Sequence, residues 1–267
     1  MIQFCTLLRL NAAALFGLSL VAVAAPAPQH IDVQKVSTTV ENVVVPRPDE
    51  VFGALNKLGG VNWKEYVRTD RNSNFTERPR IALLLGSVIA DGFIAVQAED
   101  TPAVKEIGQR VQSLAERINV KSSITQHAKA IIEGADKKKW DNVRRELDRT
   151  QNSVQEAMNE LHDQKLSQLV SLGGWLRGTE ILTAVVTKNY KTEGAELLHQ
   201  PDLLGHFEAQ LNDMPEFKTQ TPLIDQIHGA LTEVKPLIAT PQKISPEAVR
   251  KINEITTRLD SAIVTKQ

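Results

Sequence analysis

Two long apolar segments constrain the fold of this chain more than any other feature. The first, residues 81–98, is apolar on every side of a helix, and the second, residues 166–187, is similar, although Gly173, Gly174 and Gly178 interrupt it. A helix that is apolar all round needs cover on all sides, from either protein or lipid. Asp91, near the middle of the first segment, would cost about 3 kcal/mol in a bilayer on insertion scales. We therefore expect two central core helices and no membrane span in the mature chain.

Most of the chain after Pro48 has the spacing typical of amphipathic helices. Aromatic residues make up only 4%, which argues against a β-sandwich or barrel. The sequence thus predicts an all-α fold, a bundle of about nine or ten helices around the two central ones, in one domain over residues 49–267. The clearest helix carries small or apolar residues at alternating spacings of three and four: Trp140, Val143, Leu147, Thr150, Val154, Ala157 and Leu161. A coiled-coil dimer is the alternative, but so short a seam favours an intramolecular bundle.

The first residues have the order of a secretory signal peptide. Arg9 precedes an apolar run over residues 10–21, and the small-x-small sequence Ala22-Val23-Ala24 follows. We predict a signal peptide over residues 1–24, with an uncleaved anchor as the alternative. Cleavage would remove Cys5, the single cysteine, and leave no disulfide, thiolate nucleophile or cysteine metal site. An exported chain of this size without disulfides fits the bacterial periplasm.

Residues 25–48 are rich in proline and poor in charge, and they alternate loosely between apolar and polar residues. A single edge strand is one interpretation. We expect a mobile linker or an extended N-terminal arm instead, because no strand candidate lies downstream to pair with it.

The sequence contains no motif that identifies a reaction. A formal net charge of −1 gives no basic excess for nucleic-acid binding. Gly-x-Ser-x-Gly is missing, and Gly173, Gly174 and Gly178 follow no strand that could form a phosphate-binding loop. Those glycines are better explained as small residues that let two helices approach closely. We assign no catalytic residue, cofactor or metal ligand.

Two acid–histidine pairs deserve comparison with di-metal proteins. Glu196 and His199, and Asp225 and His228, each have the i, i+3 spacing that carboxylate-bridged di-metal bundles use. Chance alone produces nearly one such pair in a chain of this composition, so a di-metal enzyme ranks third among our hypotheses.

Charges inside the apolar segments are the strongest candidates for a site. Asp91 lies in the first segment, and Arg177 and Glu180 lie in the second. Unpartnered buried charges cost several kcal/mol, so we predict that Asp91 and Arg177 lie within ion-pair reach, with Glu180 close to Arg177. A structural ion pair is one interpretation. The other is a polar ligand-binding pocket lined by these three residues together with Gln97 and Trp175.

Our leading hypothesis is a non-enzymatic, exported protein that binds or scaffolds in the cell envelope, with an unknown protein partner. The second is a small-ligand-binding protein with a pocket between the central helices.

Overall fold

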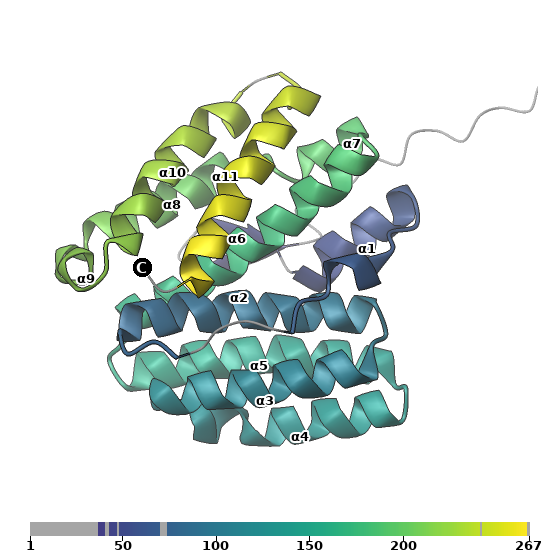
Figure 1. Cartoon of the computed structure of the whole chain (residues 1–267), viewed down its shortest axis with the longest axis vertical. Helices are drawn as coiled ribbons and strands as arrows, with labels where there is room; N and C mark the ends of the chain where they lie inside the picture. Colours follow the sequence, from purple (N-terminus) through teal and green to yellow (C-terminus); the bar gives the residue numbers. More distant parts are fainter. Residues whose placement is uncertain (1–36, 41–42, 47, 70–73, 241, 266–267) are drawn as a thin grey trace, which may run out of the picture.

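The computed structural model describes residues 37–40, 43–46, 48–69, 74–240 and 242–265, and the expected signal peptide and its cleavage site lie outside them. The all-α prediction is confirmed (Figure 1). A single-turn 3-10 helix covers Trp63–Tyr66. The α-helices are α1 (Pro48–Leu58), α2 (Arg78–Gln97), α3 (Thr101–Arg117), α4 (Lys121–Asp136), α5 (Trp140–Glu160), α6 (Gln164–Lys188), α7 (Thr192–Glu196), α8 (Pro201–Asn212), α9 (Pro215–Gln220), α10 (Leu223–Ile238) and α11 (Pro246–Val264).

The helices form two groups that meet at the central pair. In the first group α2, α3, α4 and α5 run side by side, and in the second α6, α8, α10 and α11 cross them obliquely (Figure 1). The most extensive packing in the described structure is between α2 and α6, one helix from each group. The two apolar segments therefore form the junction between the groups, as central core helices should.

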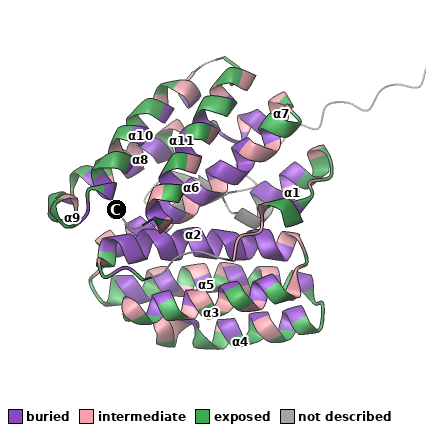
Figure 2. Ribbon diagram, viewed as in Figure 1, coloured by how far each residue is buried: buried purple, intermediate pink, exposed green. Residues whose placement is uncertain are grey.

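Burial separates the central helices from the amphipathic ones (Figure 2). Every residue from Pro79 to Val96 in α2 is buried. Both α2 and α6 are long and apolar enough to cross a membrane, but the apolar windows are 100% and 67% buried inside the protein. Protein thus supplies the cover that the sequence requires for these helices.

The approach of α2 to α6 is so close that two glycines have no room for a side chain. A Cβ on Gly86 would lie 1.9 Å from the carbonyl oxygen of Val170, and one on Gly173 would lie 2.0 Å from that of Leu83. Backbone therefore packs directly on backbone, as expected for small residues at a helix crossing. Gly178 differs, because a Cβ there would meet nothing within 4 Å.

The amphipathic seam of α5 also matches its spacing, with one exception at its end. Its residues from Trp140 to Ala157 are buried, whereas Leu161 follows the last turn and is 50% exposed. In the last turn of α5, Met158 is buried instead of Leu161. Helix α9 was not anticipated, because it is shorter than two turns and buries no residue.

The N-terminal segment differs from the expectation of an unpaired arm. Strands β1 (Ser37–Val40) and β2 (Val43–Pro46) pair antiparallel, with Val40 opposite Val43 and Ser37 opposite Pro46. The expectation that no strand pairs in this segment was wrong, because the partner strand lies within the same valine-rich segment and not downstream of it. β2 lies beside α8.

Substitution of Gly173 by alanine tests the crossing. The added Cβ would overlap the backbone of α2, so the helices would have to separate, and we expect a loss of about 3 kcal/mol in unfolding free energy. Gly229→Ala in α10 is the control, because nothing lies within 4 Å of its Cβ position. Helix propensity should make that variant neutral or more stable by up to about 1 kcal/mol. Urea denaturation measures both, and equal stabilities would contradict the proposed backbone contact.

Candidate functional site

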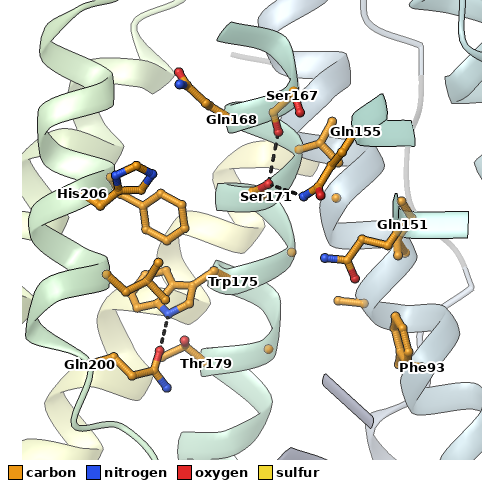
Figure 3. Close-up of a pocket in the computed structure, with 18 of the residues that line it drawn as sticks. Phe93, Gln151, Gln155, Ser167, Gln168, Ser171, Trp175, Thr179, Gln200 and His206 are labelled. Atoms are coloured by element: carbon orange, nitrogen blue, oxygen red, sulfur yellow. Dashed lines mark hydrogen bonds between the residues drawn. The ribbon is translucent and has the colours of Figure 1, made fainter. Parts of the chain in front are cut away.

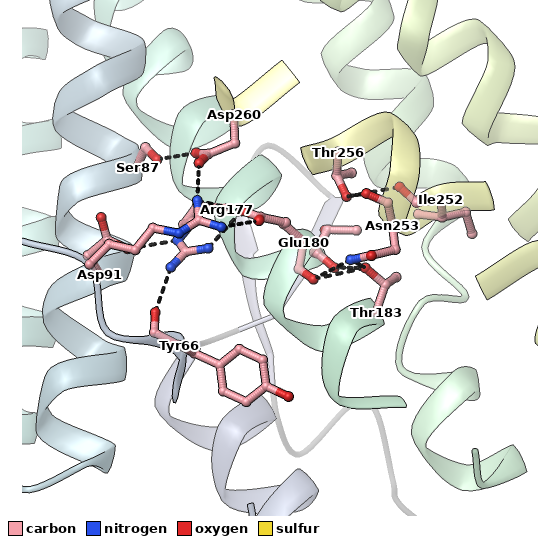
Figure 4. A network of polar contacts seen from close by, with 12 residues as sticks. Tyr66, Ser87, Asp91, Arg177, Glu180, Thr183, Ile252, Asn253, Thr256 and Asp260 are labelled. Carbon is pink, nitrogen blue, oxygen red and sulfur yellow. Dashed lines mark hydrogen bonds and ion pairs between the residues drawn. The ribbon is translucent and has the colours of Figure 1, made fainter. Parts of the chain in front are cut away.

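Arg177 is the centre of a buried polar network (Figure 4). Its side chain is 0% exposed. Nε donates a hydrogen bond to Oδ1 of Asp91 at 2.7 Å, and Nη1 donates to Oε2 of Glu180 at 2.7 Å. Nη2 donates to the backbone oxygen of Tyr66 at 2.8 Å. The predicted pairing of Asp91, Arg177 and Glu180 is confirmed.

The network extends to two charged residues that the sequence did not single out. Arg68 donates to Oε1 of Glu180 at 2.6 Å and to Oδ2 of Asp260, on α11, at 2.8 Å. Ser87 on α2 donates to the other oxygen of Asp260 at 2.7 Å. The Arg68 side chain is 40% exposed, so the network reaches from the core to the surface.

The network places two guanidinium groups among three carboxylates. Burial alone would lower the pKa of Arg177, but the carboxylates of Asp91, Glu180 and Asp260 outweigh it and raise that pKa, so the guanidinium stays charged. The five charged side chains connect α2, α6, α11 and the segment before α2. We interpret these five side chains as a structural clamp across the junction of the two helix groups, and we use that name for them below.

A cavity of about 420 Å³ lies on another side of α6 (Figure 3). Its size is within the usual range for small-molecule sites, roughly 300–1,000 Å³. The walls come from α1, α2, α5, α6 and α8, and thus from both helix groups. Exposed lining residues mark its open side: Asn152, Asn159 and Gln164.

The lining combines an apolar surface with uncharged polar groups. Its apolar part includes Phe52, Ile89, Phe93, Trp175, Leu203 and Phe207. Hydroxyl and amide side chains supply most of the polarity: Gln151, Gln155, Gln168, Gln200, Gln210, Ser167, Ser171 and Thr179. His206 is the one titratable side chain among the lining residues, which include no Asp, Glu, Lys or Arg.

The structure divides the five predicted pocket residues among three places. Asp91, Arg177 and Glu180 form the clamp and do not line the cavity, whereas Trp175 does. Gln97 belongs to neither, and its side-chain oxygen accepts a hydrogen bond from Asn56 at 3.3 Å. The expectation of one shared pocket is therefore corrected. The reason is helical geometry. Residues two apart, such as 175 and 177, are rotated by about 200° around the helix axis, so their side chains point to nearly opposite sides of the helix.

Sequence reasoning missed the polar wall of the cavity. Gln151 and Gln155 lie one turn apart on α5 and face α6 (Figure 3). Four residues of α6 at spacings of four, three and four also share its cavity face: Ser171, Trp175, Gly178 and Leu182. That spacing was a usable signal, but the all-round apolarity of α6 concealed it.

The two acid–histidine pairs do not converge. Within the described ranges, no three His, Cys, Asp or Glu side chains are placed to hold a metal ion. Asp225 is exposed and lies 3.7 Å from Nζ of Lys218. The geometry therefore gives no support to the di-metal hypothesis.

A Ser–His–Glu arrangement connects α4 and α5. Nδ1 of His127 lies 2.9 Å from Oε2 of Glu146, and Nε2 lies 3.1 Å from Oγ of Ser153. These distances resemble those of a hydrolase triad. However, Ser153 lies inside α5, where backbone N–H groups are engaged in the helix and cannot form an oxyanion hole. None of the three residues lines the cavity, so we assign them to helix packing.

The chain matches no protein-family model, no curated protein and no solved structure. Its function is therefore argued from its own geometry.

Replacement of Arg177 by methionine tests the clamp. The change takes the guanidinium away from Asp91, while Arg68 still contacts Glu180 and Asp260, so we expect a loss of roughly 3–5 kcal/mol. Adding Asp91→Asn should recover part of the loss. Arg78→Met is the control, because its ion pair with Asp163 is partly exposed to solvent and should contribute under about 1 kcal/mol. Small additive effects in thermal denaturation would contradict the clamp.

The contact between His127 and Glu146 predicts a pH dependence. The hydrogen bond from His127, aided by Arg149, lowers the pKa of Glu146 despite partial burial. A carboxyl whose pKa is depressed in the folded state stabilises the fold above its unfolded pKa, and this contribution is lost as pH falls through the folded value. Glu146→Gln should therefore lower Tm at neutral pH, and the difference from the wild type should shrink in acid. The exposed Glu156→Gln is the control, and a difference that grows in acid would contradict the assignment.

Proposed function

We propose that this chain is an exported binding protein that holds a small uncharged molecule in the cavity between α2, α5, α6 and α8. The observation that carries the proposal is a cavity of about 420 Å³ whose lining combines apolar and aromatic side chains with uncharged hydrogen-bonding groups. Mostly apolar concave sites with a few placed polar groups are the usual form of small-molecule sites.

The absence of charge from the lining favours a neutral ligand. A carboxylate, phosphate or ammonium group would lose its hydration on entry and would find no side chain of opposite permanent charge among the lining residues. Desolvation of an unpaired charge costs several kcal/mol. Amides and hydroxyls, in contrast, can satisfy neutral donors and acceptors.

The surface gives less support to a scaffolding role. Docking faces for protein partners usually expose a contiguous apolar patch. Over the described part of the chain, Leu161 is the one large hydrophobic residue that is exposed. The small-ligand hypothesis, second on sequence grounds, is therefore the one we favour. Export to the periplasm remains part of the proposal and is supported by the pattern of residues 1–24.

Gly178→Leu tests the cavity directly. Nothing lies within 4 Å of its Cβ position and the residue lines the cavity, so leucine should fill the space without disturbing the helices. We expect the wild type to gain Tm with at least one member of a library of uncharged small molecules. The variant should bind that compound at least about tenfold more weakly, which corresponds to about 1.4 kcal/mol.

Gly229→Leu is the matched control, because it places the same side chain in open space on α10, away from the cavity. Its response to the library should equal that of the wild type. The proposed function is contradicted if the wild type responds to no compound, or if Gly178→Leu responds as the wild type does.

A further inference from the structure

We propose that the cavity selects a flat aromatic ring that carries an uncharged amide-type edge, such as a carboxamide or a lactam. This inference rests on the proposed function and adds the chemical class of the ligand. Three observations carry it: a floor without side chains, a fixed aromatic wall, and a side-chain amide that faces open space.

The floor of the cavity is built from residues with almost no side chain. Gly86 and Ala90 of α2 and Gly174 and Gly178 of α6 all line it. Packing against α6 accounts for Gly86, but nothing lies within 4 Å of the Cβ position of Gly178. The backbone of α6 is therefore accessible from the cavity at that turn, and a flat ring can lie against it.

Aromatic side chains stand on two sides of this floor. Trp175 and Phe93 lie on opposite sides of the cavity (Figure 3). Nε1 of Trp175 donates to Oε1 of Gln200 at 3.0 Å, and the ring of Phe207 packs 5.6 Å from that of Trp175, centroid to centroid. The indole is thus held in place before a ligand arrives. A pre-organised aromatic face favours a ring that can stack on it, because little side-chain freedom is lost on binding.

Gln151 supplies the polar recognition. Its side chain is partly buried, its amide points across the cavity toward α6 (Figure 3), and it hydrogen-bonds to no other described residue. Gln155, one turn later, already donates to Oγ of Ser171 at 3.0 Å. A carboxamide presents a donor and an acceptor side by side, so its best partner is another group with the same pair, as in an amide or a lactam.

Three matched compounds test the inference by isothermal titration calorimetry on the mature chain. 2-Naphthamide has both the ring and the amide, 2-naphthoate replaces the amide with a carboxylate, and decahydronaphthalene-2-carboxamide keeps the amide but has no aromatic ring. We expect 2-naphthamide to bind at least tenfold more tightly than either of the others. Gly178→Leu should abolish its binding.

A variant of Gln151 tests whether its side-chain amide contacts the amide of the ligand. Gln151→Met keeps the length of the side chain, so it should weaken 2-naphthamide about tenfold while leaving the affinity for 2-ethylnaphthalene unchanged. Gln109→Met, on the exposed surface of α3, is the control and should change neither affinity. Equal weakening of both compounds by Gln151→Met would show a packing role and overturn the assignment.

The outcomes separate this inference from the proposed function. If 2-naphthoate or the saturated amide binds as tightly as 2-naphthamide and Gly178→Leu blocks all three, the ligand class is wrong and the cavity remains a binding site. If none of the three binds to the wild type, the ligand class is also wrong. The library measurement with Gly178→Leu decides the binding function by itself.

Discussion

The backbone contact between α2 and α6 determines where the other parts of the structure lie. At Gly86 and Gly173 the two helices touch without intervening side chains. Each of the two helices belongs to its own group. Because they touch only where they cross, neither can shield the whole apolar surface of the other from solvent. The remaining helices supply the cover, α3 and α5 around α2, and α8 and α11 around α6. A side chain at either glycine would push the groups apart and alter every surface between them.

The crossing also separates two polar regions that the sequence places close together. Arg177 and Glu180 leave α6 toward α11 and the segment before α2, where they meet Arg68 and Asp260. Trp175 leaves the same helix toward α8. The charged side of α6 is therefore closed by compensating ion pairs, whereas its uncharged side faces the cavity. Charged groups that are already paired in this way have few hydrogen-bonding positions left for a ligand.

The local sequence pattern was sufficient to predict much of the fold. All-round apolarity marked α2 and α6, and alternating spacings of three and four marked α5. The cost of an unpartnered buried charge was enough to predict the pairing of Asp91 with Arg177 from the sequence. These inferences succeeded because each depends on one helix or on one strong energetic penalty.

The remaining features depend on contacts between distant segments, which a single sequence does not reveal. Arg68 meets Asp260 across 192 positions of the chain, and His127 meets Glu146 only after α4 and α5 pack together. The cavity is still harder to predict from the sequence, because its glutamines come from α5, α6, α8 and the residue before α8. None of these glutamines stands out in its own segment, and only their convergence gives them a possible role. The β-hairpin escapes sequence analysis for a different reason, because its two short strands follow each other so closely that they resemble one alternating segment.

The clamp and the cavity place opposite demands on the same junction. A cavity removes packing contacts from its walls and so weakens the structure around it. The clamp connects α2, α6 and α11 on another side of α6. Ion pairs in a buried network require a defined geometry, and we interpret this network as fixing the relative position of the helices. A cavity whose walls come from both helix groups keeps its shape only if those groups cannot slide. Under the proposed binding function, the buried charges would contribute indirectly, by holding the walls of the cavity in place.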